Sequence, residues 1–338
     1  MKMQEAVSLK PYNTFGIDVS ANRFVEVTSA EELITLLKNE EHSTQPLLIL
    51  GGGSNLLLTK DFNGLVIKNS INGIAVTTED DDYVFVKAGA GEVWHHFVLF
   101  CIENNLAGVE NLSLIPGNVG AGPMQNIGAY GVELKDVFQQ LEALHIKDRT
   151  MKIFSKEECR FGYRESVFKN VVKGQYIITS VTFRLNKIPV LNTSYGAIEQ
   201  ELQRMGVKEP TIKSVSDAVI HIRRSKLPDP AVLGNAGSFF KNPEIEMEHY
   251  EKVKLQHPGL VAYPAAEGRM KVAAGWLIEQ CGWKGKRVGN TGSHKDQALV
   301  LVNYGGAKGN EIFDLALDIK RSVQERFGID IEPEVNVI

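Results

Sequence analysis

The residue best placed to do chemistry is a serine in a rigid segment of the second half of the chain. Residues 227–243 read L-P-D-P-A-V-L-G-N-A-G-S-F-F-K-N-P, so Ser238 follows Gly237 and precedes two phenylalanines. Pro228 and Pro230 stiffen the approach, because proline fixes its own φ and restricts the residue before it. No G-x-S-x-G elbow or partner base marks the serine as a nucleophile. We interpret it as a proton donor, with a structural serine in a tight loop as the alternative.

An arginine-rich segment could bind a carboxylate. Residues 159–166 read C-R-F-G-Y-R-E-S and place two arginines beside aromatic residues. A guanidinium group in such a setting is shaped for bidentate contact with a carboxylate. A structural ion pair with Glu165 or Glu158 explains the segment equally well.

A second basic cluster lies directly before the serine segment. Residues 221–226 read H-I-R-R-S-K. Such runs are commonly solvated surfaces, but this one adjoins a rigid loop. Charge-assisted hydrogen bonds contribute about 1.5–3 kcal/mol each, so the position favours a substrate that carries a diphosphate.

Three polar side chains in the C-terminal part of the chain have open assignments. Glu334 lies in I-E-P-E-V, which alternates apolar and acidic residues as an edge strand does, and from the pattern alone its carboxylate is best placed in water. Gln297 and His294 precede an apolar run and can line a cleft, although a histidine at the start of a strand is usually structural.

Two glycine-rich loops suggest a large cofactor. The apolar run 47–50 leads into G-G-G-S-N at 51–55, where backbone N–H groups can converge on an anion. This is neither the dinucleotide pattern nor a Walker loop, and a glycine-rich hairpin is the alternative. Residues 115–131 carry five glycines, with Asn118, Gln125 and Asn126 among them. Two such loops suit a ligand with a diphosphate at one end and a ring system at the other, as in FAD; an irregular surface loop is the alternative for the second.

The elements that must position these residues are irregularly interspersed. Helices are predicted after the capping box Ser29–Glu32 and over 92–104, 271–281 and 311–327, the last capped by Asn310 and ended by Gly328. Strands are predicted over 47–50, 64–68, 83–88, 175–185, 297–303 and 329–337. Because no regular β-α period links them, the fold class is α+β rather than doubly wound. Breaks are expected near residue 70 and near 224–230.

Composition limits the class of protein. With 338 residues the chain is long enough for two or three domains. A net charge of −4 gives no reason to expect nucleic acid or an anionic membrane as a partner, and no apolar run is long enough to span a membrane. The three cysteines lack metal-ligand or disulfide spacing, so we expect no metal site and a cytoplasmic location.

Taken together, the motifs resemble a known family. G-G-G-S-N, I-P-G-N-V-G-A-G-P-M-Q-N-I-G-A-Y-G, C-R-F-G-Y-R-E-S, L-P-D-P…G-N-A-G-S-F-F-K-N-P and E-P-E-V occur in the order typical of the UDP-N-acetylenolpyruvoylglucosamine reductase (MurB) family. Asn13-Thr14-Phe15-Gly16 is similar to its N-terminal signature. The chain resembles the longer, type I branch, because Tyr195 and a loop containing Tyr263 are both present.

The resemblance implies a fold and a domain order. It implies an FAD-binding module of the PCMH (vanillyl-alcohol-oxidase) type, built of two α+β subdomains, and a C-terminal α+β substrate-binding domain. The first subdomain is expected over 1–70 and the second over 71–225, joined by a C-terminal strand at 329–338. The substrate-binding domain is expected over 226–328.

The resemblance also implies a reaction and its catalytic groups. NADPH reduces FAD and leaves, and UDP-N-acetylglucosamine enolpyruvate then takes a hydride from flavin N5, which leads to UDP-N-acetylmuramate for peptidoglycan synthesis. Ser238 matches the family's proton donor. Arg164 and Glu334 match the pair that polarises the enolpyruvyl carboxylate and stabilises the intermediate.

Further positions match the binding residues of the family. Those in the flavin-lining loops are Gly51, Gly52, Gly53, Ser54, Asn55, Pro116, Gly117 and Gln125. Those matching substrate contacts are Tyr130, Tyr195, Arg223, Lys226, Asn242, Tyr263 and Gln297. The resemblance implies a monomer without nucleic-acid or membrane partners.

The chain departs from the family pattern at two places. Asn336 stands where type I members often have an arginine, and Gly120-Ala121-Gly122 lacks the serines often found there. Two other functions stay open: an FAD-dependent oxidase of the same fold, and a non-catalytic protein that binds nucleotide sugars. Retention of Arg164, Ser238 and Glu334 together argues against the second.

Overall fold

Residues 1–265 and 268–338 are described by the computed structural model, and they combine helices and strands in the predicted α+β manner. They divide into two units. Unit 1 comprises Met1–Val7, Ala21–Gly52 and Phe62–Ser225, and unit 2 comprises Ser8–Ser20, Gly53–Asp61 and Lys226–Ile338. The predicted division of residues 1–225 near residue 70 stays a prediction.

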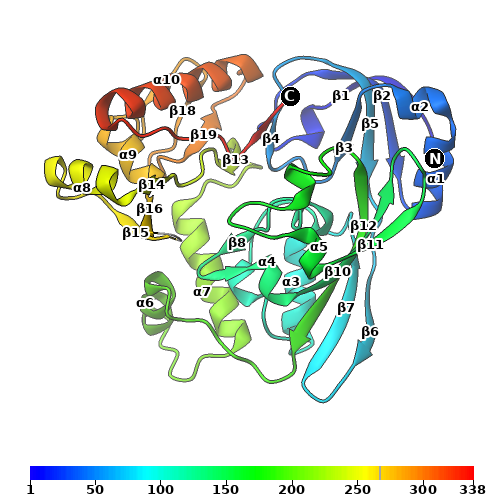
Figure 1. Ribbon diagram of the computed structural model, residues 1–338, viewed down its shortest axis with the longest axis horizontal. Coiled ribbons are helices and arrows are strands. Elements are labelled where there is room, and N and C mark those ends of the chain that lie inside the picture. Colours follow the sequence, from blue (N-terminus) through cyan, green and yellow to red (C-terminus); the bar gives the residue numbers. More distant parts are fainter. Residues whose placement is uncertain (266–267) are drawn as a thin grey trace. The chain divides into compact units, whose positions relative to one another are not determined.

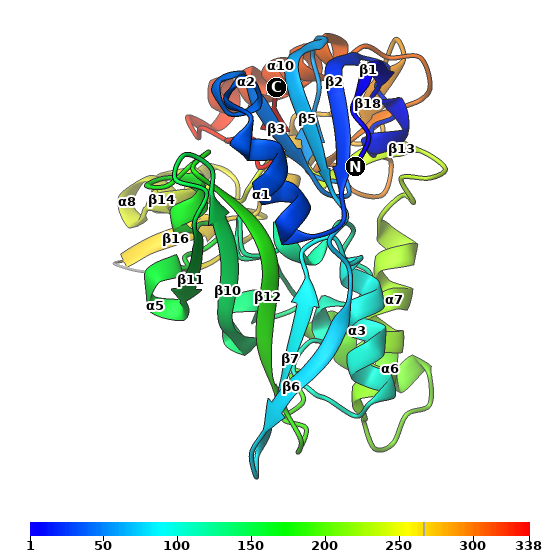
Figure 2. The ribbon, with the colours of Figure 1, turned by 90° about the vertical axis from the view of Figure 1, so that its right-hand side faces the viewer.

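The first sheet of unit 1 is mainly parallel. Its strands follow the order β1 (Gln4–Ser8), β2 (Ser20–Val27), β5 (Phe62–Asn69) and β3 (Leu47–Leu50), and both β2 and β3 run parallel to β5. Helix α1 (Ala30–Lys38) covers one face, where its leucines join a core with β2 and β5 (Figure 2). Ser29 caps α1 as predicted, because its Oγ accepts the N–H of Glu32 at 3.2 Å.

The second sheet of unit 1 is antiparallel. Its order is β11 (Met151–Ser155), β10 (Phe138–His145), β12 (Tyr176–Asn186), β7 (Tyr83–Gly89) and β6 (Ile74–Glu79). Helix α3 (Trp94–Glu103) packs on it through Phe97, whose ring centroid lies 4.5 Å from that of Phe183. The predicted strands 83–88 and 175–185 and the predicted helix 92–104 are thus confirmed to within two residues.

Two helices form a smaller core in unit 1. Apolar side chains of α6 (Gly196–Arg204) and α7 (Ile212–Lys226) pack together (Figure 1). The remaining short elements of this unit are α2 (Glu40–Thr44), β8 (Gly128–Ala129), β9 (Val132–Glu133), α4 (Leu134–Val137) and α5 (Lys156–Cys159).

Unit 2 is built around a four-stranded sheet. Its order is β13 (Gly234–Ser238), β19 (Val300–Asn303), β18 (Thr291–Ser293) and β17 (Arg287–Val288). Helices α9 (Ala274–Gln280) and α10 (Gly309–Phe327) share its apolar core. The other elements are β4 (Leu56–Leu57), β14 (Glu244–Glu246), α8 (Met247–Gln256), β15 (Ala262–Pro264), β16 (Arg269–Val272) and β20 (Asn336–Val337).

Several boundaries differ from the sequence-based predictions. The N-cap of α10 is Lys308 and not Asn310, whereas Gly328 ends this helix at φ +65° as predicted. The strand predicted over 329–337 is wrong for most of its length. Pro333 offers no N–H to a ladder, and the segment forms only one isolated bridge with Phe240 and the two-residue strand β20. β20 pairs in parallel with β4.

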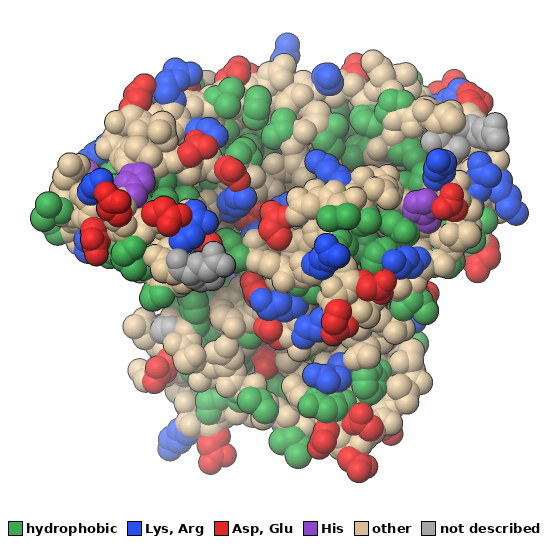
Figure 3. Space-filling model, in the orientation of Figure 1, with side chains coloured by type: hydrophobic (Ala, Val, Ile, Leu, Met, Phe, Trp, Pro, Cys, Tyr) green, Lys and Arg blue, Asp and Glu red, His purple; other side chains and the backbone are tan. Residues whose placement is uncertain are grey.

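The surface carries charges of both signs. Lysines and arginines are interspersed with aspartates and glutamates over the face in Figure 3. Among the residues that the structure describes, no helix combines the length and apolar character needed to cross a bilayer.

Candidate active site

The two glycine-rich loops of the sequence meet within unit 1. A Cβ atom added to Gly52 would lie 2.8 Å from Oδ1 of Asn118 and 3.0 Å from Cα of Gly117. A Cβ on Gly51 would lie 3.3 Å from the same oxygen. Just after the end of β3, the backbone at Gly52 therefore lies close to the backbone at Gly117. A flat ligand lying against these loops needs such an approach, and so the residues present fit an FAD-binding site.

The second loop is anchored to the start of α3. The carbonyl of Gly117, a residue with φ +107°, accepts the N–H of Trp94 at 2.9 Å. The Asn118 side chain donates to the carbonyl of Gly91. Pro116 is exposed and Gln125 half-buried at the two ends of this stretch. Backbone hydrogen bonds to a buried helix thus hold an irregular loop in one conformation.

Gly53, Ser54 and Asn55 belong to unit 2 and serve its packing. Gly53 has φ +62°, and a Cβ there would lie 2.0 Å from the carbonyl oxygen of Tyr12. Its own carbonyl accepts the N–H of Thr14 at 3.1 Å. The amide of Asn55 donates to the carbonyl of Glu334 at 3.4 Å. The N-terminal signature and the G-G-G-S-N loop are therefore neighbours, and the C-terminal segment is tied to them.

Unit 2 holds Ser238 and Glu334 on adjacent backbone segments. Ser238 is the last residue of β13 and pairs with Val300. The N–H of Glu334 donates to the carbonyl of Phe239 at 2.7 Å. Within the described part of the chain, the half-buried Ser238 hydroxyl makes no hydrogen bond. The Ser238 hydroxyl and the Glu334 carboxyl thus lie on two segments that are joined by the backbone hydrogen bond between Glu334 and Phe239.

Arg164 is held by the backbone of unit 1. It has φ +55°, and its Nη2 donates to the carbonyl of Gly128 at 2.6 Å. Neither structural ion pair considered from the sequence occurs among the described residues: Glu158 pairs with Lys152 and Glu165 with Lys169. Because Arg164 belongs to unit 1 and the other two catalytic positions belong to unit 2, their convergence stays a prediction.

Three predicted substrate residues form a cluster in unit 1. The rings of Tyr130 and Tyr195 meet edge to face, with centroids 5.7 Å apart. The charge of the Arg223 guanidinium acts on the Tyr130 hydroxyl and lowers its pKa, and Nε of Arg223 donates to the carbonyl of Leu114 at 3.2 Å. Burial lowers the pKa of Arg223 and raises the pKa of Tyr130, while the arginine charge partly offsets the latter. The cluster can bind an anion beside an aromatic surface.

The remaining predicted substrate residues belong to unit 2. Oδ1 of Asn242 accepts the N–H of Ala274 at 3.0 Å, at the start of α9. Gln297 is close to the same helix end, because a Cβ on Gly275 would lie 3.3 Å from its Oε1. Tyr263, in β15, and Lys226, which ends α7, are both exposed.

Sequence reasoning missed one residue that organises the tyrosine cluster. Asn111 is buried, and its Nδ2 donates to the carbonyls of Tyr130 and Asn192, both at 2.9 Å. It thereby joins the loop of Tyr130 to the segment leading to Tyr195. Nothing in the sequence around Asn111 marks this role, because both partners are carbonyl groups.

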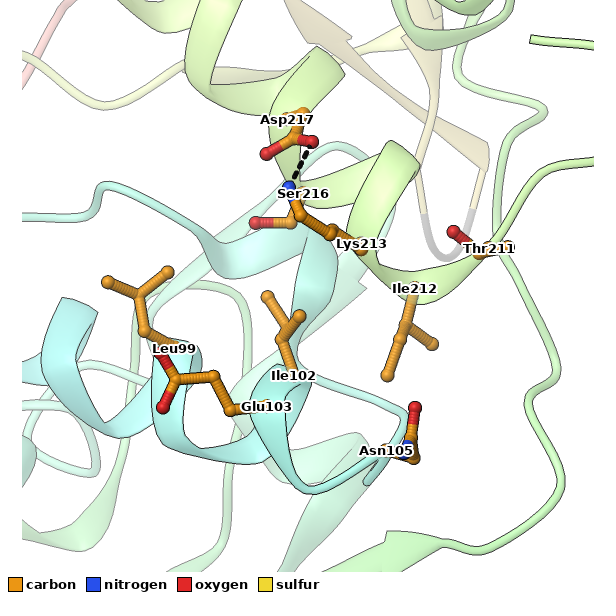
Figure 4. Close-up of a pocket in the computed structure, with 9 residues that line it drawn as sticks. All are labelled: Leu99, Ile102, Glu103, Asn105, Thr211, Ile212, Lys213, Ser216 and Asp217. Carbon is orange, nitrogen blue, oxygen red and sulfur yellow. Dashed lines mark hydrogen bonds and ion pairs between the residues drawn. The ribbon is translucent and has the colours of Figure 1, made fainter.

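A cavity of about 470 Å³ lies between the C-terminal end of α3 and the N-terminal end of α7 (Figure 4). Its apolar side chains include Ile102 and Ile212, and its charged pair, Lys213 and Asp217, is joined at 2.7 Å. None of the predicted site residues lines it. The chemistry of the candidate site therefore lies elsewhere.

Comparisons with known proteins agree with this arrangement. Residues 21–153 match the family model "FAD binding domain", and residues 229–338 match "UDP-N-acetylenolpyruvoylglucosamine reductase, C-terminal domain". The chain is 55% identical over 339 residues to the UDP-N-acetylenolpyruvoylglucosamine reductase of Flavobacterium johnsoniae, with all of both chains covered. Identity to the protein of that name from Pseudomonas syringae pv. syringae is 52%, covering 100% of this chain and 99% of the relative. The crystal structure of MurB from Thermus caldophilus matches 99% of both chains with a TM-score of 0.66 and 26% identity.

Proposed function

The chain belongs to the UDP-N-acetylenolpyruvoylglucosamine reductase family, and from this premise we propose how its residues carry out the reaction. It is an FAD-dependent reductase of peptidoglycan precursor synthesis, with UDP-N-acetylglucosamine enolpyruvate as substrate and NADPH as reductant. The observation that carries this conclusion is the 55% identity over the whole chain. When bound, FAD supplies the carrier that takes a hydride from NADPH and passes it to the enolpyruvyl group.

The glycine loops hold the cofactor in this proposal. Gly52 approaches the backbone of Gly117 and the side chain of Asn118 so closely that a Cβ there would require a shift, and Gly51 lies against the same Asn118 side chain. The N–H groups of Gly51 and Gly52 and those of the loop 115–131 are available to diphosphate oxygens and ring atoms. Pro116 and Gln125 of unit 1 are also assigned to the cofactor, as are Gly53, Ser54 and Asn55, which follow Gly52 in the chain.

Ser238 donates the proton that completes the reduction. Its Oγ–H bond breaks as a C–H bond forms at the substrate carbon next to the carboxylate, and the serine is later reprotonated from solvent. General-acid catalysis of this kind contributes about 10²–10⁴-fold. A hydroxyl at a strand end, carried between Gly237 and the buried Phe239, is well oriented for this step.

Arg164, and Glu334 as a protonated carboxyl that donates a hydrogen bond, stabilise the negative charge that develops on the enolpyruvyl group. A guanidinium group matches a carboxylate with two parallel hydrogen bonds. A correctly aimed donor at a developing oxyanion contributes about 2.7–4 kcal/mol. Glu334 accompanies Ser238 because the backbone pairing with Phe239 carries both.

Charged side chains and aromatic side chains bind the nucleotide sugar in this proposal. Arg223 and Lys226 are assigned to the anionic diphosphate, and Tyr130 and Tyr195 to the cluster around it. Asn242, Tyr263 and Gln297 are assigned to the sugar and uridine. Support comes from the electrostatic interaction between Tyr130 and the half-buried Arg223, whose Nε is held by the carbonyl of Leu114.

We place the enzyme in the cytoplasm as a monomer. In the described residues the three cysteines are unpaired, and burial with nearby Glu158 and Glu157 raises the pKa of the Cys159 thiol to about 12. Inert thiols suit a reducing compartment. Sedimentation at the mass of two chains would contradict the monomer.

The decisive experiment separates the two half-reactions of Ser238→Ala. Rapid-mixing absorbance should show flavin reduction by NADPH at the wild-type rate, because this step uses no proton from the serine. Reoxidation by the enolpyruvyl substrate should slow by about 10²–10⁴-fold. Ser225→Ala, at the exposed end of α7, is the matched control. Equal loss of both half-reactions would refute the proton-donor role.

A further inference from the structure

The side chain of His95, at the start of α3, accepts a hydrogen bond from the loop that contains Leu114. The backbone N–H of Leu114 donates a hydrogen bond to Nδ1 of His95 at 3.0 Å. A backbone N–H can only donate, so Nδ1 must be unprotonated and the ring proton must be on Nε2. His95 makes this bond only as a neutral imidazole.

Leu114 needs such support because of its backbone conformation. Its φ of +58° lies in the left-handed region, which residues with a side chain rarely adopt. Its carbonyl accepts Nε of Arg223 at 3.2 Å, and the Arg223 charge in turn acts on the Tyr130 hydroxyl. Both backbone groups of one strained residue therefore link His95 to Arg223.

We propose that His95 is a positioning residue for substrate binding, which holds Leu114 so that its carbonyl orients the Arg223 guanidinium. The proposal rests on the function proposed above, because that function assigns Arg223 and Tyr130 to the substrate. His95 itself is placed in no contact with substrate or flavin. Its effect should therefore be on affinity and not on the chemical step.

The surroundings of His95 keep it neutral. Burial lowers its pKa first, and the charges of His96, Arg224 and Arg223 lower it further. His96 is its exposed neighbour on α3, both arginines come from α7, and Leu114 adds no charge. Protonation would bring a second N–H against that of Leu114, so substrate affinity should fall as the pH drops through the pKa of His95.

Three variants of the FAD-loaded enzyme test the proposal. His95→Leu removes the acceptor and should raise the KM for the enolpyruvyl substrate about 3- to 10-fold, the range of one net hydrogen bond, with kcat unchanged. His95→Asn replaces Nδ1 by an oxygen that accepts at every pH. It should keep the wild-type KM at pH 8 and lose the rise of KM in acid. His96→Asn, one residue along, should keep that rise.

A readout independent of turnover separates this proposal from the proposed function. In ¹⁵N spectra, His95 should show an unprotonated Nδ1, and the Leu114 amide signal should shift as His95 titrates, in wild type but not in His95→Asn. Calorimetry with UDP as the probe should show weaker binding to His95→Leu. Absence of turnover in wild type would overturn the proposed function alone.

Three results would overturn the role of His95. They are a protonated Nδ1 at neutral pH, an acidic rise of KM that persists in His95→Asn, and unchanged UDP affinity in His95→Leu. If His95→Leu does not fold, as judged by circular dichroism, His95→Asn and the Leu114 amide decide the question.

Discussion

The two units position their functional groups by different physical means. In unit 1, Tyr130 and Arg223 depend on side-chain hydrogen bonds, with Asn111 and Leu114 between them. In unit 2, the segment carrying Glu334 is placed by backbone hydrogen bonds to the strand that ends at Ser238. Hydrogen bonds between backbone groups do not require particular side chains on the residues that form them. A side-chain network, in contrast, fails when one member is replaced.

This contrast suggests how each unit responds to mutation. Replacement of a functional side chain in unit 2 should remove its chemistry and leave the fold intact. Replacement of a supporting side chain in unit 1 should change stability and affinity together. Buried polar groups without partners cost about 1–3 kcal/mol each, whereas exposed ones cost little.

The largest effect is expected for Glu334→Ala in unit 2. Loss of one group that stabilises the developing charge should lower the rate of flavin reoxidation by substrate about 10²–10³-fold. The fold should be retained, because the hydrogen bond to Phe239 comes from the backbone of residue 334. Rapid mixing and calorimetry measure the two quantities.

Glu332→Ala is the matched control on the same segment. Its backbone carbonyl accepts the N–H of Lys241 at 3.0 Å, and its carboxylate forms a surface ion pair with that lysine at 2.6 Å. Surface pairs contribute about 0–1 kcal/mol, and so both rate and stability should be close to wild type. A melting temperature that falls only in Glu334→Ala would break the proposed contrast, because the side chain would then be structural.

The next effect is expected for Asn111→Leu in unit 1. The variant leaves the carbonyls of Tyr130 and Asn192 without their buried donor. The free energy of unfolding in urea should fall by about 2–4 kcal/mol, since each orphaned group costs about 1–3 kcal/mol. KM for the substrate should rise as well, because Tyr130 loses its backbone anchor.

Asn104→Leu provides the comparison for this change. Asn104 also donates from Nδ2 to a carbonyl, that of Phe100 at 2.8 Å, but it is exposed. Water can replace the lost donor there, so stability should change by less than about 0.5 kcal/mol. If the two variants were equally stable, burial would not explain the sensitivity of the cluster.

The same contrast explains which features the sequence could predict. The end of α10 at Gly328 was readable, because a glycine after an apolar helical stripe commonly adopts positive φ. The prediction of a strand over 329–337 was wrong, because it relied on the alternation of apolar and acidic residues and gave too little weight to Pro333. The positive φ values of Leu114 and Arg164 have no local signal at all. Both residues form hydrogen bonds with residues distant in sequence, and only coordinates reveal these bonds.

The smallest effect concerns the dependence of stability on pH, which has opposite signs for Glu110 in unit 1 and His294 in unit 2. Burial raises the pKa of Glu110 in unit 1, whose carboxylate accepts the N–H of Gly108 at 2.7 Å. Burial lowers the pKa of His294 in unit 2, whose Nδ1 accepts the N–H of Asp296 at 3.3 Å. Both groups prefer to be neutral in the folded chain.

The signs follow from linkage between protonation and folding. The contribution of Glu110 is complete below its unfolded pKa of about 4.3 and is lost as pH rises through the folded pKa. The contribution of His294 is present above its unfolded pKa of about 6.5 and is lost as pH falls through the folded pKa. Raising the pH should therefore remove the contribution of Glu110 to the stability of unit 1 and restore the contribution of His294 to the stability of unit 2.

Hydrogen exchange resolved by residue can measure the two trends in one sample. Protection in the sheet of β10 and β12 should decline with rising pH, after correction for the intrinsic exchange rate, and Glu110→Gln should abolish the decline. Protection in the sheet of β18 and β19 should increase, and His294→Gln should abolish the increase. Each variant also serves as a control for the other unit. Glu110→Gln should leave the trend in the sheet of β18 and β19 unchanged, and His294→Gln should leave the trend in the sheet of β10 and β12 unchanged. A single trend shared by both sheets would mean that the units open together, and the separate treatment of their stabilities would then be wrong.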